Sequence, residues 1–429
     1  MRDEQTEVLV VGAGPVGLLT GLLLAEAGIQ VKIIDRGERT AARSYACALH
    51  PRTLKLLERL ELAPKVLELG RRIGAMAFYD GDSRRGEISL AVPGGDFPFL
   101  LILPQDAFED ALELELRREW GVVVDWNHRF EAVEEKFDGV DVAVEKLGGT
   151  ATGYIVPHWE TVVRKRLQVH ARFLLGADGQ NSMVRQRLGI EHEQIAGRQF
   201  FAAYEFEPDG KIDDELRVVL DKTTTNVLWP LPGNKCRWTF QVLKSETPAD
   251  FPEKVRRPGR VSEKTVDENI RQYVEQVAKQ RAPWFSAGVK ELAWCTEVFF
   301  EHRLAKRYGQ GRCWLVGDAA HQTGPVGAQS MNVGCFEAED LVMKLKKILR
   351  ENAPLNSLEA YNRSWRSEWQ SLLGTSGGLK AGNDATPWAR DNSARILPCL
   401  PASGAALAGL AGQLGLQVVQ NELSRAAGV

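Results

Sequence analysis

Residues 8–17 read Val-Leu-Val-Val-Gly-Ala-Gly-Pro-Val-Gly, an apolar run that leads into the pattern G-x-G-x-x-G. The apolar run predicts a buried strand of a parallel sheet. Pro15–Ala27 carries apolar residues at helical spacing and ends before Gly28, a typical helix C-cap. Val31–Ile34 is the next predicted strand. We therefore predict a strand–helix–strand unit of about 30 residues in this region.

Each glycine of this pattern has a physical role in binding a dinucleotide. Gly12 permits the tight turn after the strand, Gly14 lets a pyrophosphate approach the backbone, and Gly17 lets the helix pack close to the strand. Pro15 and Val16 begin the helix, whose free N–H groups and positive dipole end attract an anion. The pattern predicts a dinucleotide site but does not distinguish FAD from NAD.

Aspartates follow three predicted strands that lie far apart in the sequence. Asp35 comes 23 residues after the first glycine of the pattern, where an acceptor for a ribose hydroxyl is expected. Asp178 follows a predicted strand at residues 172–175, and Asp318 follows one at residues 313–316. If these strands share one parallel sheet, their carboxyl ends line one crevice, and the intervening chain must leave the sheet and return. The alternative role for such an aspartate is to cap a helix or form a turn.

The rest of the chain contains both strand and helix periodicities. A period of two predicts a hairpin or meander over residues 122–173, and residues 200–243 carry further strand patterns with a turn at Trp229–Asn234. Most aromatic side chains on these strands are expected in a sheet core, and the others in an apolar pocket: Phe200, Phe201, Tyr204, Phe206, Trp229, Trp238 and Phe240. Helical patterns cover residues 51–69, 105–118, 267–279 and 331–349.

Three motifs follow one another along the chain: Gly12–Gly17, Gly176-Ala-Asp-Gly179 and Gly317-Asp-Ala-Ala-His321, the last leading into a glycine-rich loop and a helix. In this order and spacing the sequence resembles the class A flavoprotein monooxygenases, the para-hydroxybenzoate hydroxylase-like family of FAD-dependent aromatic hydroxylases. The resemblance spans about residues 5–375. It implies a non-covalently bound FAD and hydroxylation of an aromatic or polyketide-like small molecule with NAD(P)H and O2, through a flavin C4a-hydroperoxide.

The resemblance also implies roles for individual residues at the matching positions. Asp35 would bind the adenosine ribose, with Arg36 beside the adenine. Gln105 would contact the flavin. The pair Asp178–Gly179 would lie near the pyrophosphate and the path of the nicotinamide, and Asp318 would hold the ribityl or pyrophosphate region.

In the family the loop after the third motif lies against the isoalloxazine ring. Pro325 and Gly327 in the loop, and Met331 and Asn332 at the start of the helix, match the family's positions there. The dipole of this helix would stabilise negative charge on the reduced ring. His321 invites a general-base interpretation because imidazole titrates near neutral pH, whereas the family pattern makes it a structural residue.

The sequence departs from the family's usual pattern at four positions. Gly324 stands where a proline is usual, and Ala328 and Ser330 stand where glycines are common. Tyr45 occupies a position that is often arginine, so Arg43 would reach the pyrophosphate in its place. A glycine in place of proline gives the loop beside the flavin more backbone freedom.

From these elements we predict an α/β protein with three parts. A Rossmann-like FAD-binding domain is built on a parallel sheet, a substrate domain with a mainly antiparallel sheet is inserted into it, and a helical region follows. The FAD-binding domain is expected to be discontinuous and to comprise residues 1–72, 100–180 and 292–355. The substrate domain would comprise residues 73–99 and 181–291, and the C-terminal helical region residues 356–429.

The composition is that of an ordinary globular protein, since 44% of the 429 residues are apolar and 26% are charged. The net charge of −3 gives no electrostatic reason to expect a nucleic acid or an anionic membrane as partner. The six cysteines form no C-x-x-C pair and do not cluster with the seven histidines, so neither a metal site nor a disulfide framework is expected. We expect a cytoplasmic protein without a signal peptide, either monomeric or homodimeric.

Residues 396–419 are rich in Leu, Ala and Gly. Prolines and glutamines interrupt this segment before it reaches the ~20 apolar residues that a membrane-spanning helix needs, so no membrane insertion is expected. An amphipathic C-terminal helix packed on the body is predicted, with contact to a membrane surface as the alternative.

Other activities remain open at this point. An epoxidase or a Baeyer–Villiger reaction can use the same scaffold, and a non-catalytic protein that binds FAD and shelters a ligand is a further alternative. A halogenase typically carries W-x-W-x-I-P, which this sequence lacks, and a simple NAD dehydrogenase would lack the second and third motifs. The single G-x-G-x-x-G argues against a separate NADPH domain. The sequence does not identify the substrate or choose between NADH and NADPH.

Overall fold

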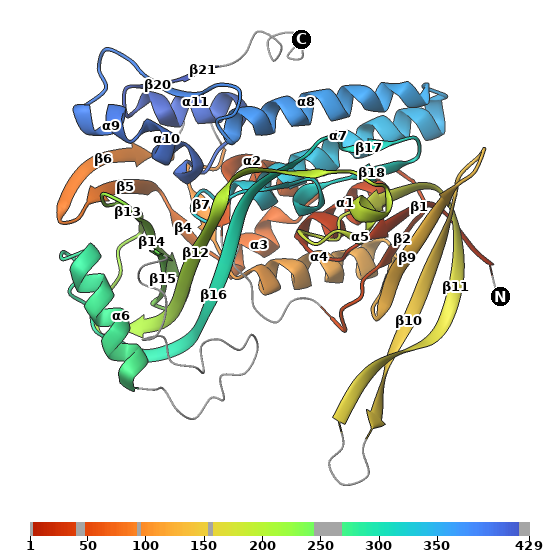
Figure 1. The fold of residues 1–429 in the computed structure, drawn as a ribbon, viewed down its shortest axis with the longest axis horizontal. Helices are drawn as coiled ribbons and strands as arrows, with labels where there is room; N and C mark the ends of the chain where they lie inside the picture. The colour runs from red at the N-terminus through yellow and green to blue at the C-terminus, as the bar shows by residue number, and fades with distance from the viewer. Residues whose placement is uncertain (1–2, 40–47, 92–95, 153–157, 244–267, 420–429) are drawn as a thin grey trace.

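The computed structural model describes residues 3–39, 48–91, 96–152, 158–243 and 268–419, which form two eight-stranded sheets, two smaller sheets and surrounding helices (Figure 1). The first large sheet has the order β17-β18-β11-β1-β2-β8, and β10 and β9 extend it beside β11 as an antiparallel meander. Its strands are β1 (Asp3–Val11), β2 (Val31–Ile34), β8 (Val124–Asp125), β9 (His128–Glu135), β10 (Val140–Thr152), β11 (His158–Gly176), β17 (Gly309–Gln310) and β18 (Cys313–Leu315).

The three strands that carry the motifs are neighbours in this sheet. β1 pairs in parallel with β2 and β11, and β18 pairs in parallel with β11. Val11 lies opposite Gly176, and Gly176 lies opposite Leu315, so the carboxyl ends of the three strands are level. The prediction that these distant segments share one sheet is confirmed, and the loops that follow them meet at one edge.

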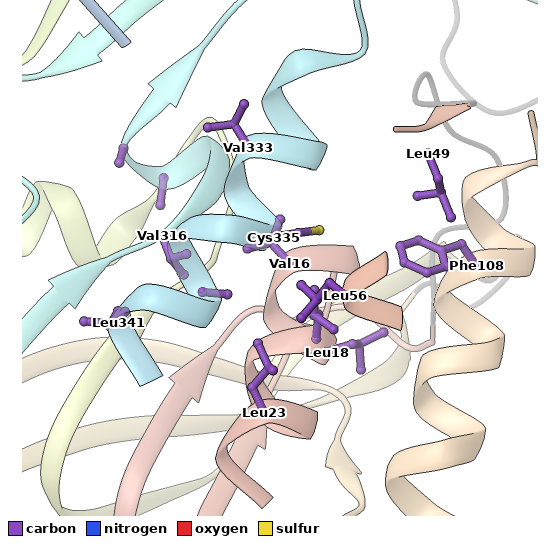
Figure 2. Packing of buried hydrophobic residues seen from close by; sticks show 14 of the residues in the cluster. Val16, Leu18, Leu23, Leu49, Leu56, Phe108, Val316, Val333, Cys335 and Leu341 are labelled. Atoms are coloured by element: carbon purple, nitrogen blue, oxygen red, sulfur yellow. The ribbon is translucent and has the colours of Figure 1, made fainter. Parts of the chain in front are cut away.

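Helix α1 is enclosed between the sheet and other helices. In Figure 2, Val16, Leu18 and Leu23 of α1 lie among buried side chains of α7 and near Leu56 and Phe108. Because neighbours surround α1, its apolar residues face every direction rather than forming one stripe. The helices around the first sheet are α1 (Pro15–Glu26), α2 (Pro51–Arg59), α3 (Ala63–Leu69), α4 (Gln105–Glu119), α5 (Met183–Arg187) and α7 (Gln329–Glu351), with the short 3₁₀ turn η2 (Gly317–Ala319) after β18.

The second large sheet has the order β19-β16-β12-β15-β14-β13-β5-β6 and is antiparallel except for the pair β13 and β5. The long strands β12 and β16 run from the region of the first sheet out to helix α6 (Figure 1). The strands are β5 (Ala75–Asp80), β6 (Ser83–Ser89), β12 (His192–Pro208), β13 (Glu215–Leu220), β14 (Thr225–Leu231), β15 (Lys235–Val242), β16 (Val289–Ala305) and β19 (His321–Gln322); α6 spans Glu268–Arg281, and a small sheet joins β3 (Ala48–Leu49), β7 (Leu100–Ile102) and β4 (Arg71–Ile73).

Aromatic side chains form much of the core beneath this second sheet. Tyr204, Trp238 and Phe240 are buried, and the rings of Trp238 and Phe240 stack with their centroids 5.0 Å apart. Phe201, Phe206 and Trp229 are buried as well, whereas Phe200 is half-buried. The prediction that most of these aromatic residues belong to a sheet core is confirmed.

Three local predictions are corrected by the structure. Residues 51–69 form two helices instead of one, and Glu61 lies between them with a left-handed φ of +59°. Trp229 lies within strand β14, and the turn comes later, at Gly233 with a φ of +70°. Helix α7 begins at Gln329, two residues earlier than predicted.

The C-terminal region covers one side of both large sheets (Figure 1). Its elements are η3 (Leu355–Ser357), α8 (Leu358–Leu372), β20 (Gly378–Ala381), α9 (Pro387–Asp391), α10 (Ser393–Ile396), η4 (Leu397–Cys399), α11 (Gly404–Gly412) and β21 (Leu416–Val419). The single amphipathic helix predicted over residues 396–419 is therefore wrong: α11 is short, Gly415 turns the chain with a φ of +71°, and β21 pairs with β20.

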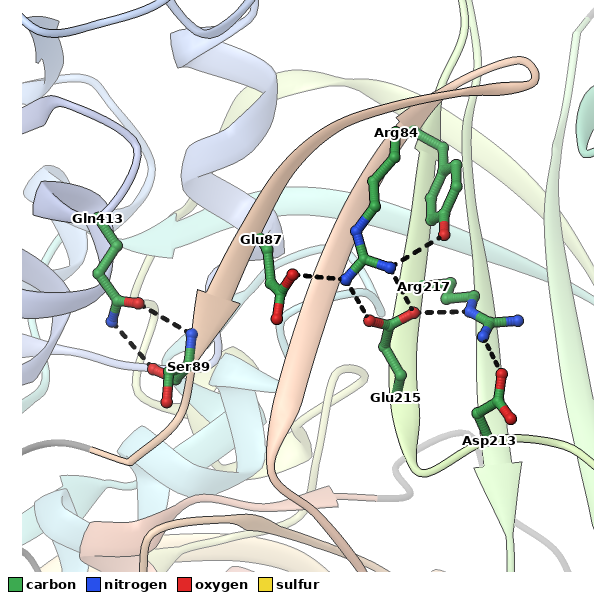
Figure 3. Close-up of polar contacts among 8 residues, drawn as sticks. Arg84, Glu87, Ser89, Asp213, Glu215, Arg217 and Gln413 are labelled. Atoms are coloured by element: carbon green, nitrogen blue, oxygen red, sulfur yellow. Dashed lines mark hydrogen bonds and ion pairs between the residues drawn. The ribbon is translucent and has the colours of Figure 1, made fainter.

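This region is tied to the second sheet by polar contacts. The side chain of Gln413 accepts a hydrogen bond from the N–H of Ser89 at 2.8 Å and donates one to its carbonyl at 2.9 Å (Figure 3). On the same sheet Arg84 of β6 bridges Glu87 and Glu215. Within the described ranges, no helix combines the length and the apolar character needed to cross a membrane.

Candidate active site

Two cavities meet where the three motif-bearing strands end. The larger has a volume of about 430 Å³ and the smaller about 290 Å³. Gly14, Ala177 and Gly179 line both, so the two cavities are adjacent at the N-terminus of α1. Both lie along the carboxyl edge of the parallel sheet, the position where such sheets bind ligands.

The glycine-rich loop between β1 and α1 contacts the loop after β11. Gly12 has a φ of +109°, and a Cβ atom there would lie 2.3 Å from the carbonyl oxygen of Ala177. A Cβ atom at Gly17 would lie 2.0 Å from the carbonyl oxygen of Gly12. In contrast, a Cβ atom at Gly14 would meet no described protein atom within 4 Å. The first and third glycines therefore allow close packing, and the second leaves space over the start of α1.

Asp35 reaches this loop from the end of β2. One carboxylate oxygen accepts a hydrogen bond from the N–H of Ala13 at 2.7 Å, and the other accepts one from Gly37 at 2.7 Å. Asp35 and Arg36 both line the smaller cavity, beside His128. Each oxygen of a carboxylate has a second acceptor position, so Asp35 can still receive hydroxyl groups of a ligand.

Asp178 also lies at this edge, but its carboxylate is engaged with helix α5. It accepts hydrogen bonds from the hydroxyl of Ser182 at 2.5 Å and from the N–H groups of Met183 at 2.7 Å and Val184 at 3.1 Å. Burial raises the pKa of this carboxyl group. The helix-capping role is thus the one that the carboxylate of Asp178 visibly performs, while Gly179, with a φ of +75°, lines both cavities.

The larger cavity collects residues from five separate segments of the chain. Gln105 is the first residue of α4, and its side chain donates a hydrogen bond to Glu109 at 2.6 Å. Asp318 lies in η2 and is exposed to the cavity. Protein atoms surround its other sides, and this burial raises the pKa of its carboxyl group. Pro325 and Met331 add apolar surface.

Helix α7 points its N-terminus into this cavity. Ala328 precedes the helix with a φ of +47°, a left-handed conformation that is uncommon for a residue with a Cβ. Ser330 and Met331, in the first turn, line the cavity. No side chain caps the helix, so its first N–H groups and its positive dipole end face the cavity, where they favour negative charge.

Asn332 and Gly327, which were both predicted to lie against a ligand, make contacts behind the loop. Asn332 is buried, accepts hydrogen bonds from the N–H of His50 and the hydroxyl of Thr53, and donates to the carbonyl oxygens of Ala48 and Ala328. A side-chain amide has two donor and two acceptor positions, and all four are therefore used in Asn332.

Gly327 packs against the C-terminal region, where a Cβ atom would lie 2.6 Å from the carbonyl oxygen of Pro398. Its N–H group donates to that same oxygen at 3.0 Å. Its own carbonyl oxygen is 2.9 Å from a ring nitrogen of His50. Tyr45, and Arg43, which was predicted to reach the pyrophosphate in its place, lie outside the described residues.

Sequence reasoning did not single out the aromatic wall of the larger cavity. Val298, Phe299 and Phe300 of β16 line it, and the ring of Phe299 meets that of Phe200 with centroids 4.0 Å apart. Phe299 is 45% exposed, which is unusual for so large an apolar side chain. The two adjacent phenylalanines in the sequence could have indicated this wall. Successive side chains of a strand point to opposite faces, so only one of the two can face the core of the sheet.

A third cavity of about 400 Å³ adjoins the larger one and is markedly polar. Its wall includes Arg185, His192, Arg198 and Arg303, with Glu301 as the opposing charge. Burial, together with the positive charges of Arg185 and Arg303, lowers the pKa of His192 to about 3. Three guanidinium groups against one carboxylate give this cavity a positive potential near its opening to the aromatic wall.

Comparison with known proteins agrees with this geometry. Residues 5–373 match the family described as FAD binding domain. The chain is 24% identical over 379 residues to pentachlorophenol 4-monooxygenase of Sphingobium chlorophenolicum, covering 87% of this chain and 64% of that protein. It is 27% identical over 362 residues to 6-methylpretetramide 4-monooxygenase of Streptomyces rimosus, covering 83% of this chain and 58% of that protein. The chain thus spans less than two thirds of the length of either relative.

The crystal structure of p-nitrophenol 4-monooxygenase from Pseudomonas putida DLL-E4 has a similar fold. It superimposes with a TM-score of 0.71 at 20% sequence identity, covering 96% of this chain and 99% of that one. This likeness confirms the predicted fold class, an α/β arrangement of a parallel sheet with an antiparallel sheet and helices.

Proposed function

The chain belongs to the FAD binding domain family, among FAD-dependent aromatic hydroxylases, and from this premise we propose that it is a monooxygenase. It would use NAD(P)H and O2 to hydroxylate an aromatic or polyketide-like small molecule. The observation that carries the proposal is the adjacency of the two cavities at the N-terminus of α1, with Asp35 lining the smaller and an aromatic wall lining the larger.

The residues present fit an extended FAD. The open space above Gly14 and the free N–H groups of α1 suit a pyrophosphate. Asp35 and Arg36 line the smaller cavity, which would take the adenosine. The larger cavity would take the flavin ring beside Gln105, Asp318 and the start of α7. The hydrogen bonds of Asp178 and Asn332 favour supporting roles for these two residues.

When bound, FAD would supply the redox chemistry, in which the two electrons of NAD(P)H are used to reduce O2, one oxygen atom passes to the substrate and the other leaves as water. The chain's own residues bind, orient and shield the reacting groups. The dipole of α7 stabilises negative charge at the cavity's inner end. The apolar surfaces of Phe299, Phe300, Pro325 and Met331 exclude water, which limits the loss of activated oxygen as hydrogen peroxide.

The aromatic wall supports an aromatic substrate. Phe299 and Phe300 line the larger cavity on the side formed by the second sheet. Planar apolar rings pack favourably against such side chains. The names of the relatives point the same way, because pentachlorophenol and 6-methylpretetramide are both aromatic compounds.

The polar cavity supports a route for the reductant. Arg185, Arg198 and Arg303 would attract the phosphates of NAD(P)H, since guanidinium groups bind phosphate in a bidentate manner. Phe299 and Glu301 line this cavity and the larger one alike, so a nicotinamide could pass between them.

The proposal is tested with the purified full chain, FAD and a panel of phenols, quinolines and polyketides under ¹⁸O2. We expect NADH or NADPH oxidation that a substrate accelerates, and a product that contains one ¹⁸O atom. An epoxide or an inserted ester oxygen in the product would identify the alternative reactions of this scaffold. FAD that binds but is reduced by neither nucleotide without oxygen present would favour the non-catalytic binding protein.

A further inference from the structure

A line of hydrogen bonds leads from the larger cavity into the protein interior. The hydroxyl of Ser330 is 2.5 Å from a carboxylate oxygen of Asp318, which faces the cavity. The same hydroxyl is 3.3 Å from Nδ1 of His321, and Nε2 of that ring is 3.0 Å from a carboxylate oxygen of Glu337. The side chains of Asp318, Ser330, His321 and Glu337 are thus connected by a continuous line of hydrogen bonds.

At the inner end of this line of hydrogen bonds, fixed donors surround the carboxylate of Glu337. Glu337 is fully buried and accepts hydrogen bonds from the N–H of Gly317 at 2.8 Å and from the indole of Trp369 at 2.9 Å. The hydroxyl of Tyr308 lies 3.1 Å from the same carboxylate. Because N–H groups can only donate, both carboxylate oxygens act as acceptors. An ionised Glu337 can only accept, and Nε2 of His321 then carries the proton of their contact.

When both contacts of Ser330 are hydrogen bonds, the remaining protons have two arrangements. Ser330 has one hydroxyl proton, and it can donate that proton to Asp318 or to His321 but not to both. If it donates to Asp318, Nδ1 of His321 must carry a proton and the ring is cationic. If it donates to Nδ1, the ring is neutral and Asp318 must itself be protonated. Either arrangement holds one extra proton, located on Asp318 or on His321.

We propose that Ser330 relays this single proton between Asp318 and His321, so that a buried residue sets the charge of the carboxylate that faces the cofactor. In the transfer, the proton of Asp318 moves to the oxygen of Ser330 while the hydroxyl proton of Ser330 moves to Nδ1 of His321. His321 and Glu337 act as positioning residues. The inference rests on the proposed function, since it makes the charge beside the bound FAD adjustable.

The relay depends on a residue that distinguishes this chain from the family's usual pattern. Ser330 stands where glycine is common, and a glycine would leave Asp318 and His321 without a bridging hydroxyl. When negative charge develops on a reduced cofactor, a proton on Asp318 removes a like charge from its vicinity. A neutral carboxyl group would repel the negative charge on the cofactor less than a carboxylate would.

The charged and titratable groups around His321 come from several elements. Glu337 lies on α7, Asp318 in η2, and Tyr308, whose pKa burial raises well above its usual value, precedes β17. The ring of Trp369 from α8 stacks on His321 with centroids 3.8 Å apart. Further out, the side chains of His192, Arg185 and Arg303 border the neighbouring polar cavity.

The test measures the pH midpoint of His321 protonation by ¹⁵N-histidine NMR on the full chain, as purified and with saturating FAD. The difference from a His321→Gln sample assigns the signal. Asp318→Asn should lower the midpoint by about one pH unit or more, because the residue opposite Ser330 then lacks charge. In a Ser330→Ala background, the same Asp318→Asn change should produce less than half of that shift.

Further variants separate the relay from a merely structural role. Ser330→Gly should reduce the Asp318→Asn shift to less than half, as Ser330→Ala does, and Ser330→Thr, which keeps the hydroxyl, should restore the full shift. Ser182→Ala removes the corresponding serine–aspartate contact at Asp178 and should leave the His321 midpoint unchanged.

The outcomes distinguish failure of the relay from failure of the proposed function. An equal Asp318→Asn shift with and without the Ser330 hydroxyl would overturn the relay, whether or not FAD binds. Absence of FAD binding to the unaltered chain, measured by flavin fluorescence, would contradict the proposed function. The His321 midpoint shifts measured in the protein as purified would then still show whether the relay exists.

Discussion

Gly12 and the carbonyl group of Ala177 are in such close contact that a Cβ atom at residue 12 would lie 2.3 Å from the carbonyl oxygen. The two residues belong to the first and second motifs, which the parallel pairing of β1 and β11 brings together. Gly14, two residues later, has free space above it. This difference between neighbouring glycines gives a direct way to separate folding from cofactor binding.

Gly12→Ala should destabilise the fold. The added methyl group would clash with the backbone after β11, and the φ of +109° is strained for alanine. We expect a loss of about 2 kcal/mol or more in the free energy of unfolding, measured by urea denaturation without FAD. Gly14→Ala serves as the matched control, with a change below about 1 kcal/mol. Equal losses in both variants would contradict the packing described for this loop.

Gly324→Pro should change how efficiently oxygen reaches the substrate. Gly324 is not among the residues with positive φ, and within the described residues its N–H group has no hydrogen-bond acceptor, so proline can be accommodated. We expect FAD to remain bound and the ratio of hydroxylated product to hydrogen peroxide to change, because the loop beside the flavin becomes stiffer. NAD(P)H consumption, product and peroxide are measured together, with Gly324→Ala as control. An unchanged ratio would show that residue 324 only turns the chain.

Arg198→Gln should weaken binding of the reductant. Arg198 lies in the polar cavity, is exposed, and pairs with Glu301 at 2.7 Å. Loss of one exposed guanidinium, which contributes about 1 kcal/mol or less, should raise the Kd for NAD(P)H roughly three- to fivefold. The Kd is measured from flavin reduction without oxygen. Arg59→Gln, which alters an ion pair with Glu26 away from this cavity, should leave it unchanged. An equal effect of both substitutions would point to a general change in surface charge.

The stability of the protein should depend on pH through His50. Burial lowers the pKa of His50 to about 4, and its ring contacts the carbonyl oxygen of Gly327 behind the loop. The unfolded chain, with an ordinary pKa of about 6.5, binds the proton more readily, so stability falls as pH decreases from about 6.5 to 4. His50→Gln should flatten urea-unfolding stability across this window by up to about 3 kcal/mol. An unaltered pH dependence would exclude His50 as its source.

The sequence predicted those parts of the site that depend on local chain geometry. Gly12, Gly14 and Asp35 lie within one strand–helix–strand unit, so their relative positions follow from its regular geometry. The carboxylate of Asp178 was harder to place, because its partners depend on where α5 begins after Ser182. Both uses of such an aspartate, ligand binding and helix capping, were consistent with the sequence.

Features that depend on contacts between distant segments could not be predicted in the same way. Phe299 and Phe300 lie on β16 of the second sheet and reach the cavity only because that sheet is docked against the first. Asn332 is occupied by the segment around His50 and Thr53, far away in the sequence. Residues 396–419 suggested one helix from their composition, but pairing of β21 with β20 determined the actual structure.

Titration of the FAD-free protein with FAD, followed by flavin fluorescence, tests the central claim most directly. The account predicts one FAD per chain with a Kd in the micromolar range or below. Gly14→Val should fold with nearly unchanged stability yet bind FAD at least tenfold more weakly, because its side chain would occupy the space left for the pyrophosphate. Absence of FAD binding to the unaltered chain, or equal affinity in Gly14→Val, would contradict the assignment of the two adjacent cavities as the cofactor site.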